Sequence, residues 1–240
     1  LAQERVAPGR FEIQAPPQIS GAGVARLVLT DLNGIERVVD VPFYATSQLL
    51  ADGLWDGSVE LGRIRRDYGL RSFSYGQRTV GSGTLRYGLS DRLTIETHGE
   101  VESRLTMGGL GVVWVPSPRI GVVSVAYARS RADDVGGGSQ YRLGYQWNGA
   151  VFHLDVSTTW RDPAFRDLAS LENSVLPRRT NQGFAGVDTP LGHFSAGYVL
   201  QRLPDEAASR IASLGWSQRF GRSASLHLTA FRDLEVDEDS

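Results

Sequence analysis

The stretch that decides the fold reads Tyr141-Arg142-Leu143-Gly144-Tyr145-Gln146-Trp147-Asn148. Successive side chains of a β-strand point to opposite faces, so this segment predicts a strand with one apolar face and one polar face. The next segment repeats the pattern, with Phe152, Leu154, Val156, Thr158 and Trp160 alternating with His153, Asp155, Ser157 and Thr159. The pair Asn148-Gly149 between them favours a two-residue hairpin turn, which predicts that the two strands are antiparallel neighbours.

The same division into two faces recurs from about residue 56 to residue 233. Further examples are Leu85, Tyr87 and Leu89 against Arg86, Gly88 and Ser90; Phe194, Ala196, Tyr198 and Leu200 against Ser195, Gly197, Val199 and Gln201; and Ala224, Leu226, Leu228 and Ala230 against Ser225, His227, Thr229 and Phe231. We count about eleven such segments, each near the roughly 9–11 residues of a tilted membrane-spanning strand. The pattern predicts a mainly-β fold, the wall of an antiparallel transmembrane β-barrel. A soluble β-sandwich or barrel also alternates with period two and is the alternative.

The connections between these segments are by turns tight and longer. The tight ones are Ser90-Asp91, Pro116-Ser117-Pro118, Asn148-Gly149, Pro190-Leu191-Gly192 and Phe220-Gly221-Arg222. The longer ones cover residues 129–138, 162–181 and 202–208, and we expect Gly136-Gly137-Gly138 in the first to be a flexible linker. Short turns at one rim and longer loops at the other are typical of outer-membrane barrels. The connection Glu102-Ser103 is short where a long one is expected.

The first 46 residues differ from the rest of the chain. The alternating runs 24–30 and 37–44 flank the turn signal Asp31-Leu32-Asn33-Gly34, so this part predicts a hairpin of a small soluble sheet. Residues 47–54, with Gly53 as the stop, predict a short helical or irregular connector. The expected organisation is therefore a small β-domain in residues 1–46, a connector in 47–54 and a barrel wall in 55–240.

Composition limits the functional classes. The chain has 240 residues, of which 41% are hydrophobic and 22% charged, and a net charge of -2, which argues against nucleic acid as a partner. It has no apolar run of roughly 18 residues that predicts a transmembrane helix. All 25 basic residues are Arg and no Cys is present, so disulfide and thiolate chemistry are excluded. The start, Leu1-Ala2-Gln3-Glu4-Arg5, has neither an initiator Met nor a signal peptide, so we expect a mature chain or a piece of a longer one.

No catalytic motif is found: the sequence has no Gly-x-Ser-x-Gly elbow, no phosphate-binding loop and no His-Glu-x-x-His helix. His153 and Ser157 share one strand face with Asp155 between them, an arrangement that suggests a membrane esterase. Residues four apart on a strand stand about 13 Å apart, however, which is too far for a nucleophile and its base. The sequence therefore predicts no catalytic residues and no enzyme activity.

The positions of the polar and aromatic side chains suggest the wall of a barrel rather than a catalytic or metal-binding site. The four histidines are dispersed along the chain, and the three that fall on the polar face are expected to be solvated: the four are His98, His153, His193 and His227. A polar stripe predicts a lumen wall rather than a metal site, and it consists of Glu96, His98, Glu100 and Glu102. Aromatic residues are expected near strand ends, at headgroup level: Trp55, Tyr87, Trp114, Tyr127, Tyr141, Trp147, Trp160, Tyr198 and Trp216. We expect no metal and no cofactor.

Several segments, in order, resemble the fimbrial outer-membrane ushers of the chaperone/usher pathway. The end of the family's plug domain and its first following strand are matched by Val6, Pro8, Gly9, Phe11 and Ile13; Val41, Pro42 and Phe43; Leu49, Leu50 and Gly53; and Gly62, Arg63, Ile64 and Arg65. Two barrel segments are also similar, Gly83-Thr84-Leu85-Arg86-Tyr87-Gly88-Leu89-Ser90 and the run from Ser157 to Leu168. The sequence departs from the family at Arg10, where the family has Pro, and at Trp160-Arg161-Asp162-Pro163.

The resemblance implies a partial chain: the C-terminal part of a β-sandwich plug domain in residues 1–46, and about half of a translocation barrel. It implies location in the bacterial outer membrane and a pore that translocates pilin subunits and assembles fimbriae. The implied partners are periplasmic chaperone–pilin complexes, the lipid bilayer and the remaining usher domains. Two alternatives stay open: a self-contained β-rich adhesin or carbohydrate-binding module, and a smaller outer-membrane barrel channel or enzyme.

Overall fold

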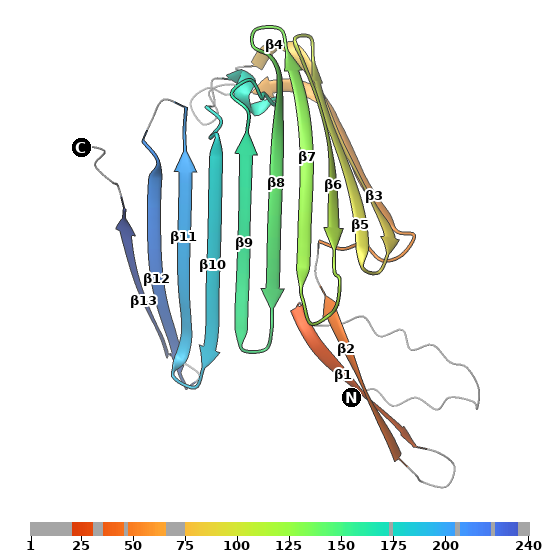
Figure 1. The fold of residues 1–240 in the computed structure, drawn as a ribbon, viewed down its shortest axis with the longest axis vertical. Coiled ribbons are helices and arrows are strands. Elements are labelled where there is room, and N and C mark those ends of the chain that lie inside the picture. The colour runs from red at the N-terminus through yellow and green to blue at the C-terminus, as the bar shows by residue number, and fades with distance from the viewer. Residues whose placement is uncertain are drawn as a thin grey trace.

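The part of the chain that the structure describes folds almost entirely into β-strands (Figure 1). The computed structural model describes residues 21–30, 36–45, 48–65, 75–172, 175–204, 207–221 and 224–234. A two-stranded sheet pairs β1 (Gly21–Thr30) with β2 (Glu36–Ala45). An eleven-stranded sheet contains β3 (Trp55–Arg65), β4 (Tyr75–Ser90), β5 (Leu93–Glu102), β6 (Leu105–Trp114), β7 (Val122–Ala132), β8 (Gly136–Asn148), β9 (Phe152–Arg161), β10 (Arg179–Thr189), β11 (Gly192–Arg202), β12 (Ser209–Phe220) and β13 (Ala224–Asp233). The short 3-10 helix η1 (Ala169–Glu172) lies between β9 and β10.

The strand order in the large sheet is the order of the chain, and every neighbouring pair is antiparallel. Strands β4 to β12 each pair with two neighbours, whereas β3 and β13 are the edges of the described sheet. The sheet curves, so that β3 to β6 lie side by side at one end of the arc and β11 to β13 at the other (Figure 1). The predicted partial barrel wall and its number of strands are confirmed. The described residues include no helix with the length and apolarity needed to cross a membrane.

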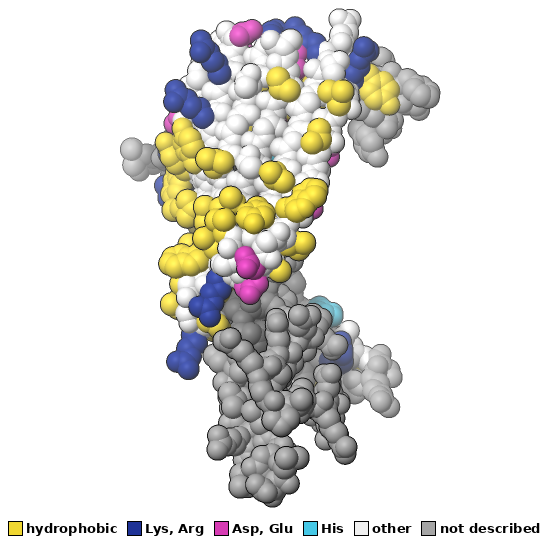
Figure 2. All heavy atoms as spheres, turned by 90° about the vertical axis from the view of Figure 1, so that its right-hand side faces the viewer, with side chains coloured by type: hydrophobic (Ala, Val, Ile, Leu, Met, Phe, Trp, Pro, Cys, Tyr) yellow, Lys and Arg dark blue, Asp and Glu magenta, His cyan; other side chains and the backbone are white. Residues whose placement is uncertain are grey.

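The register confirms that one face of the sheet is apolar. A row of directly paired, outward-facing side chains crosses six strands, and each is between 38% and 68% exposed: Trp55, Tyr87, Ile95, Val112, Val125 and Leu143. Figure 2 shows hydrophobic side chains gathered in a band across the side of the sheet where β3 to β6 lie. A monomeric soluble domain rarely exposes so large an apolar surface. This outward face therefore matches the lipid-facing surface of a barrel.

The opposite, inner face holds most of the buried side chains. Thr94, Glu102 and Ser130 are polar residues that are 0% to 6% exposed, and all three alternate with outward residues. The soluble-sandwich alternative requires a second large sheet packed on the apolar face, whereas the second sheet that the described residues form has only the two strands β1 and β2. Leu105, Met107 and Val122 are buried on the same inner face, so the covered surface combines polar and apolar groups, while large apolar side chains are exposed on the outward face.

Two predictions about the connection after β7 are wrong. Residues 129–138 do not form a long loop, because β7 continues to Ala132 and β8 begins at Gly136. The three glycines are therefore part of a strand rather than a linker, with Gly138 paired to Ser130. A Cβ atom on Gly138 would lie 2.1 Å from the backbone nitrogen of Phe165, so this position must be glycine for the β9–β10 loop to approach the wall.

The remaining sequence predictions have mixed outcomes. The hairpin is confirmed as β1–β2, and the connector is irregular, with Gly53 at a φ of 73°. The short connection between β5 and β6 is confirmed. Three of the aromatic residues expected near strand ends lie in mid-strand instead, namely Tyr127, Tyr141 and Tyr198. The motif of residues 6–13 and the turn of residues 31–34 lie outside the described residues.

An Arg in place of Leu143 would put a charge in the middle of the outward face, and an Arg in place of Leu154 would put one nearer the rim, because Leu154 is the third residue of β9 and pairs with Trp147. We expect the change at Leu143 to lower the stability of the assembled barrel by about 2–4 kcal/mol, and the change at Leu154 to lower it less. The matched changes of Gln146 or Ser157 to Arg, on the inner face of the same strands, should be tolerated. Denaturant titration of the full-length protein in lipid vesicles, followed by gel mobility without heating, measures the difference. An equal loss on both faces would contradict the assignment of the outward face to lipid.

Candidate functional site: the inner face of the sheet

The polar stripe predicted on β5 lies on the inner face, next to polar residues of β4. The register pairs Arg86 with Glu96 and Thr84 with His98. His98 uses both ring nitrogens, with Nδ1 2.8 Å from Thr84 Oγ1 and Nε2 3.0 Å from Glu100 Oε1. The stripe is therefore a connected hydrogen-bonded surface, as expected of a lumen wall. Among the described residues, no group of three or more His, Cys, Asp or Glu is placed to hold a metal ion.

Arg86 connects this wall to the segment that follows the hairpin. Its Nε lies 3.6 Å from Glu96 Oε2 and its Nη1 3.8 Å from Asp56 Oδ2, while the other terminal nitrogen donates to the backbone oxygen of Gln48. The Arg86 side chain is only 21% exposed. Hydrogen bonds from a charged donor are stronger than neutral ones, so Arg86 is a firm attachment for the connector.

The connector, residues 48–54, is docked mainly through its backbone. Leu50 N donates to Thr94 Oγ1 at 2.9 Å, and Gly53 N donates to Gly88 O at 2.9 Å. Gly88 N in turn donates to Leu54 O at 2.9 Å. A Cβ atom on Gly88 would lie 2.1 Å from Ala51 O, so only glycine permits this approach. Thr94, which is 0% exposed, has its hydroxyl fixed by the same contact.

The connector also reaches strands far along the sheet. Gln48 Nε2 donates to Gln146 Oε1 of β8 at 3.2 Å, although the two residues are 98 positions apart. A hollow of about 310 Å³ on the inner face lies beside this contact, and its lining includes Glu96, Arg142 and Asp155. Charged and amide groups around open space favour water over apolar ligands. The hollow is therefore suited to an aqueous passage rather than to a small hydrophobic molecule.

The β9–β10 loop, described at residues 162–172 and 175–178, folds inward over the wall at the other rim. Phe165 is 2% exposed, Arg166 N donates to Ser130 Oγ of β7 at 2.8 Å, and Leu168 N donates to Glu100 Oε2 of β5 at 2.8 Å. Asp162 holds the base of the loop, because its Oδ2 accepts from Ser139 N at 2.9 Å. The sequence predicts a long polar loop here but not its contacts. The loop therefore covers part of the inner face at this rim, from β9 across to β5.

One cluster was missed by the sequence analysis. His153 Nε2 lies 2.8 Å from Asp188 Oδ2, and His193 Nδ1 lies 2.9 Å from Asp188 Oδ1, so two histidines share one carboxylate. The only sequence signal was that His153 and Asp188 both fall on polar positions of their strands. His153 therefore has a carboxylate partner on β10 and forms no pair with Ser157. The suggested esterase arrangement is not assembled.

The wall with its docked connector defines a structural class: part of a transmembrane β-barrel with a polar inner face. No protein-family model matches the chain, and no curated protein sequence matches it either. Among solved structures, the chain is similar to the P pilus usher PapC translocation pore, with a TM-score of 0.62 and 14% identity over 92% of this chain and 47% of that one. It is also similar to the E. coli P pilus tip assembly intermediate PapC–PapD–PapK–PapG, with a TM-score of 0.68 and 16% identity over 90% of this chain and 28% of that one.

These similarities establish the fold: the chain has the fold of a segment of the PapC usher pore. It spans less than half the length of the matched chains. The first of these neighbours is described as a translocation pore.

The change Gly88→Ala should detach the connector, because the added methyl group cannot coexist with Ala51 O. Loss of two backbone hydrogen bonds of about 1 kcal/mol each should speed amide exchange at Leu50 and Gly53 by at least roughly tenfold. The control is Gly83→Ala, where the nearest atom to the new Cβ would be 3.6 Å away. Hydrogen–deuterium exchange of the full-length protein measures both. Unchanged protection in Gly88→Ala would show that the connector is not docked at this point.

Proposed function

We propose that this chain is part of an outer-membrane usher, a pore that translocates chaperone-delivered pilin subunits and assembles fimbriae at the cell surface. The observation that carries the proposal is the docking of the connector inside the polar face of the wall, at Arg86, Gly88 and Thr94. A wall that holds an N-terminal segment on its inner side is suited to a pore with an attached plug. The similarity of the fold to the PapC pore supports this proposal.

In this proposal, residues 1–46 are the C-terminal part of a plug domain, 47–54 the connector and 55–240 about half of the translocation barrel. The partners are periplasmic chaperone–pilin complexes, the bilayer and the remaining usher domains. The wall performs no bond chemistry. Subunits joining by β-strand addition supply the free energy, because each added strand completes a sheet.

The inner face contributes a surface over which a folded subunit can slide. Several ionic groups there are paired with one another, as Arg86 is with Glu96 and as Arg78 is with Glu102 at 3.4 Å. A paired charge offers less attraction to a passing protein than a free one. Release of the connector from Gly88 and Thr94 would accompany displacement of the plug.

Transmembrane topology is the first property to test. The connector docks beside the β4–β5 turn, so a periplasmic plug places that turn, and every second turn after it, in the periplasm. The β8–β9 turn at Asn148 is then periplasmic, and the β7–β8 turn at Asp133 is extracellular. A single Cys at Asp133, in the full-length protein without other cysteines, should react with an impermeant maleimide on intact cells. A Cys at Asn148 should not react. Labelling at Asn148 with protection at Asp133 would show that the barrel has the opposite orientation in the membrane. Labelling at neither position would favour a periplasmic soluble domain.

Contact with a translocating subunit is the second property. A photo-cross-linking amino acid at Ser157, on the inner face of β9, should capture a pilin subunit in cells that are assembling fimbriae. The neighbouring outward position, Val156, is 43% exposed and serves as the control, because it should capture none. Mass spectrometry of the cross-linked product identifies the subunit. An adduct at both positions, or at neither, would favour the smaller-channel alternative or the adhesin alternative over an usher.

A further inference from the structure

The outward face of β10 to β13 carries one arginine on each strand, toward the rim away from the connector. We call these four residues the arginine belt: Arg179, Arg202, Arg210 and Arg232. Their outward direction follows from alternation with Tyr198 and Leu214, which are 39% and 65% exposed on the apolar face. Arg179 and Arg202 are directly paired across β10 and β11. Like charges in directly opposed positions repel each other, so an anion between them would stabilise the pair.

The belt has no anionic partner among the described residues. No described acidic side chain forms an ion pair with any of the four guanidinium groups. The Nε atom of Arg210 is buried and has no hydrogen-bond partner in the described part of the chain. Arg179 Nε donates to Asn181 Oδ1 at 3.2 Å, and its guanidinium carbon lies 5.9 Å from the centre of the Trp160 ring. Among the described residues, none binds the terminal nitrogens of these four arginines.

Two of the inner arginines, by contrast, have partners on the wall. Arg86 is paired with Glu96 and Asp56, and Arg161 donates to Pro177 O at 3.1 Å and to Gln140 Oε1. No outward position of β10 to β13 in the described residues carries an acidic side chain. This part of the outward face is thus cationic at one rim and neutral below it.

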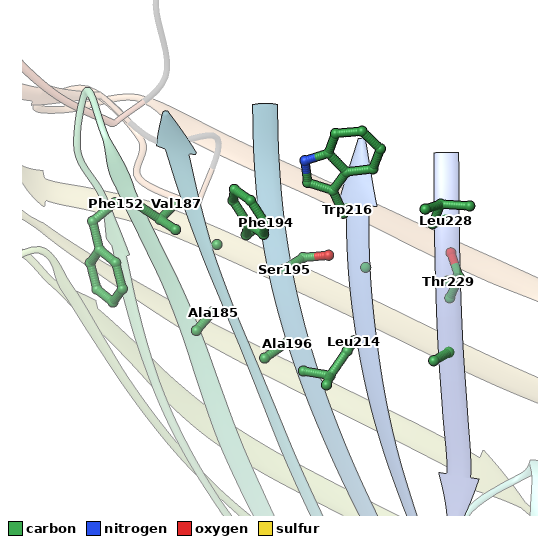
Figure 3. Close-up of a pocket in the computed structure, with 13 residues that line it drawn as sticks. Phe152, Ala185, Val187, Phe194, Ser195, Ala196, Leu214, Trp216, Leu228 and Thr229 are labelled. Atoms are coloured by element: carbon green, nitrogen blue, oxygen red, sulfur yellow. The ribbon is translucent and has the colours of Figure 1, made fainter. Parts of the chain in front are cut away.

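An apolar hollow of about 550 Å³ lies on the same strands, toward the opposite rim (Figure 3). Small side chains such as Ala185 and Ala196 form part of its lining, beside the larger Phe194, Leu214 and Trp216. Trp216 is held in place because its Nε1 donates to Leu191 O at 2.9 Å. In the strand register the hollow is one to three outward positions away from the belt, which is roughly 7–20 Å along a strand at 3.3 Å per residue. An acyl chain spans this distance.

We propose that the outward face of β10 to β13 is a binding site for a phosphorylated lipid, whose headgroup phosphates lie on the arginine belt and whose acyl chain lies in the apolar hollow. Arginine suits this ligand, because its planar guanidinium group binds phosphate oxygens through two parallel hydrogen bonds. The proposal rests on the proposed function, since this face meets lipid only if the sheet spans a membrane. In that topology the belt faces the extracellular leaflet.

The test uses the full-length protein in neutral detergent, with phosphatidic acid as the probe and phosphatidylcholine as its uncharged counterpart. Native mass spectrometry measures the lipid retained. We expect wild-type protein to retain phosphatidic acid in preference to phosphatidylcholine. The double change Arg202→Gln and Arg210→Gln should weaken phosphatidic acid binding by roughly thirtyfold, about fivefold for each arginine near a headgroup. The matched control is Arg142→Gln with Arg219→Gln, which are exposed arginines on inward positions.

A second variant tests the hollow separately. Ala196→Leu fills part of it, and should weaken binding of long-chain but not short-chain phosphatidic acid. A third measurement uses wild-type protein at high salt. Roughly 1 M salt reduces the electrostatic screening length to about 3 Å and should remove the preference for the charged lipid. Equal binding by wild-type protein, the belt variant and the control would overturn the lipid site.

Gel mobility without heating distinguishes failure of the lipid-site proposal from failure of the proposed function. A wild-type protein that forms a heat-modifiable barrel but shows no preference for phosphatidic acid disproves the lipid site alone. A wild-type protein that forms no barrel overturns the proposed function, and the lipid site with it.

Discussion

A backbone N–H or C=O group that faces hydrocarbon without a partner costs several kcal/mol, and this constraint underlies the whole arrangement. Strands β4 to β12 satisfy it by pairing on both sides, in the order of the chain. Once every strand is paired, its side chains can only point outward or inward. The division into an apolar outward face and a polar inner face follows from that geometry.

The inner face is shaped as much by missing side chains as by those present. Gly88 lets the connector approach the wall, and Gly138 does the same for the β9–β10 loop. The polar groups around these glycines, among them Thr94, Ser130 and Glu100, then bind the backbone of the incoming segments. The wall thus holds two segments at opposite rims by the same means, a glycine for close approach and a polar side chain for attachment.

Periodicity was sufficient to predict the eleven strands and the face on which each residue lies, because both depend only on neighbours along the chain. It failed where distant segments meet. The glycines at 136–138 resembled a linker, because the close approach that requires glycine at Gly138, that of the Phe165 backbone, comes from a later loop. The bridge of Asp188 to His153 and His193 depends on the register of three strands, which alternation alone does not give. The contact of Gln48 with Gln146 spans most of the sheet and has no local signal.

The connector is attached largely by its main-chain atoms, through Leu50 N, Gly53 N and Leu54 O. Main-chain groups are the same whatever the side chain, so residues such as Ala51 and Asp52, which are exposed, can change over evolution without loss of attachment. Selection should instead constrain the wall residues that bind the connector, Gly88 and Thr94. Among divergent relatives, the positions of Gly88 and Thr94 should therefore be recognisable even where the connector has no common sequence.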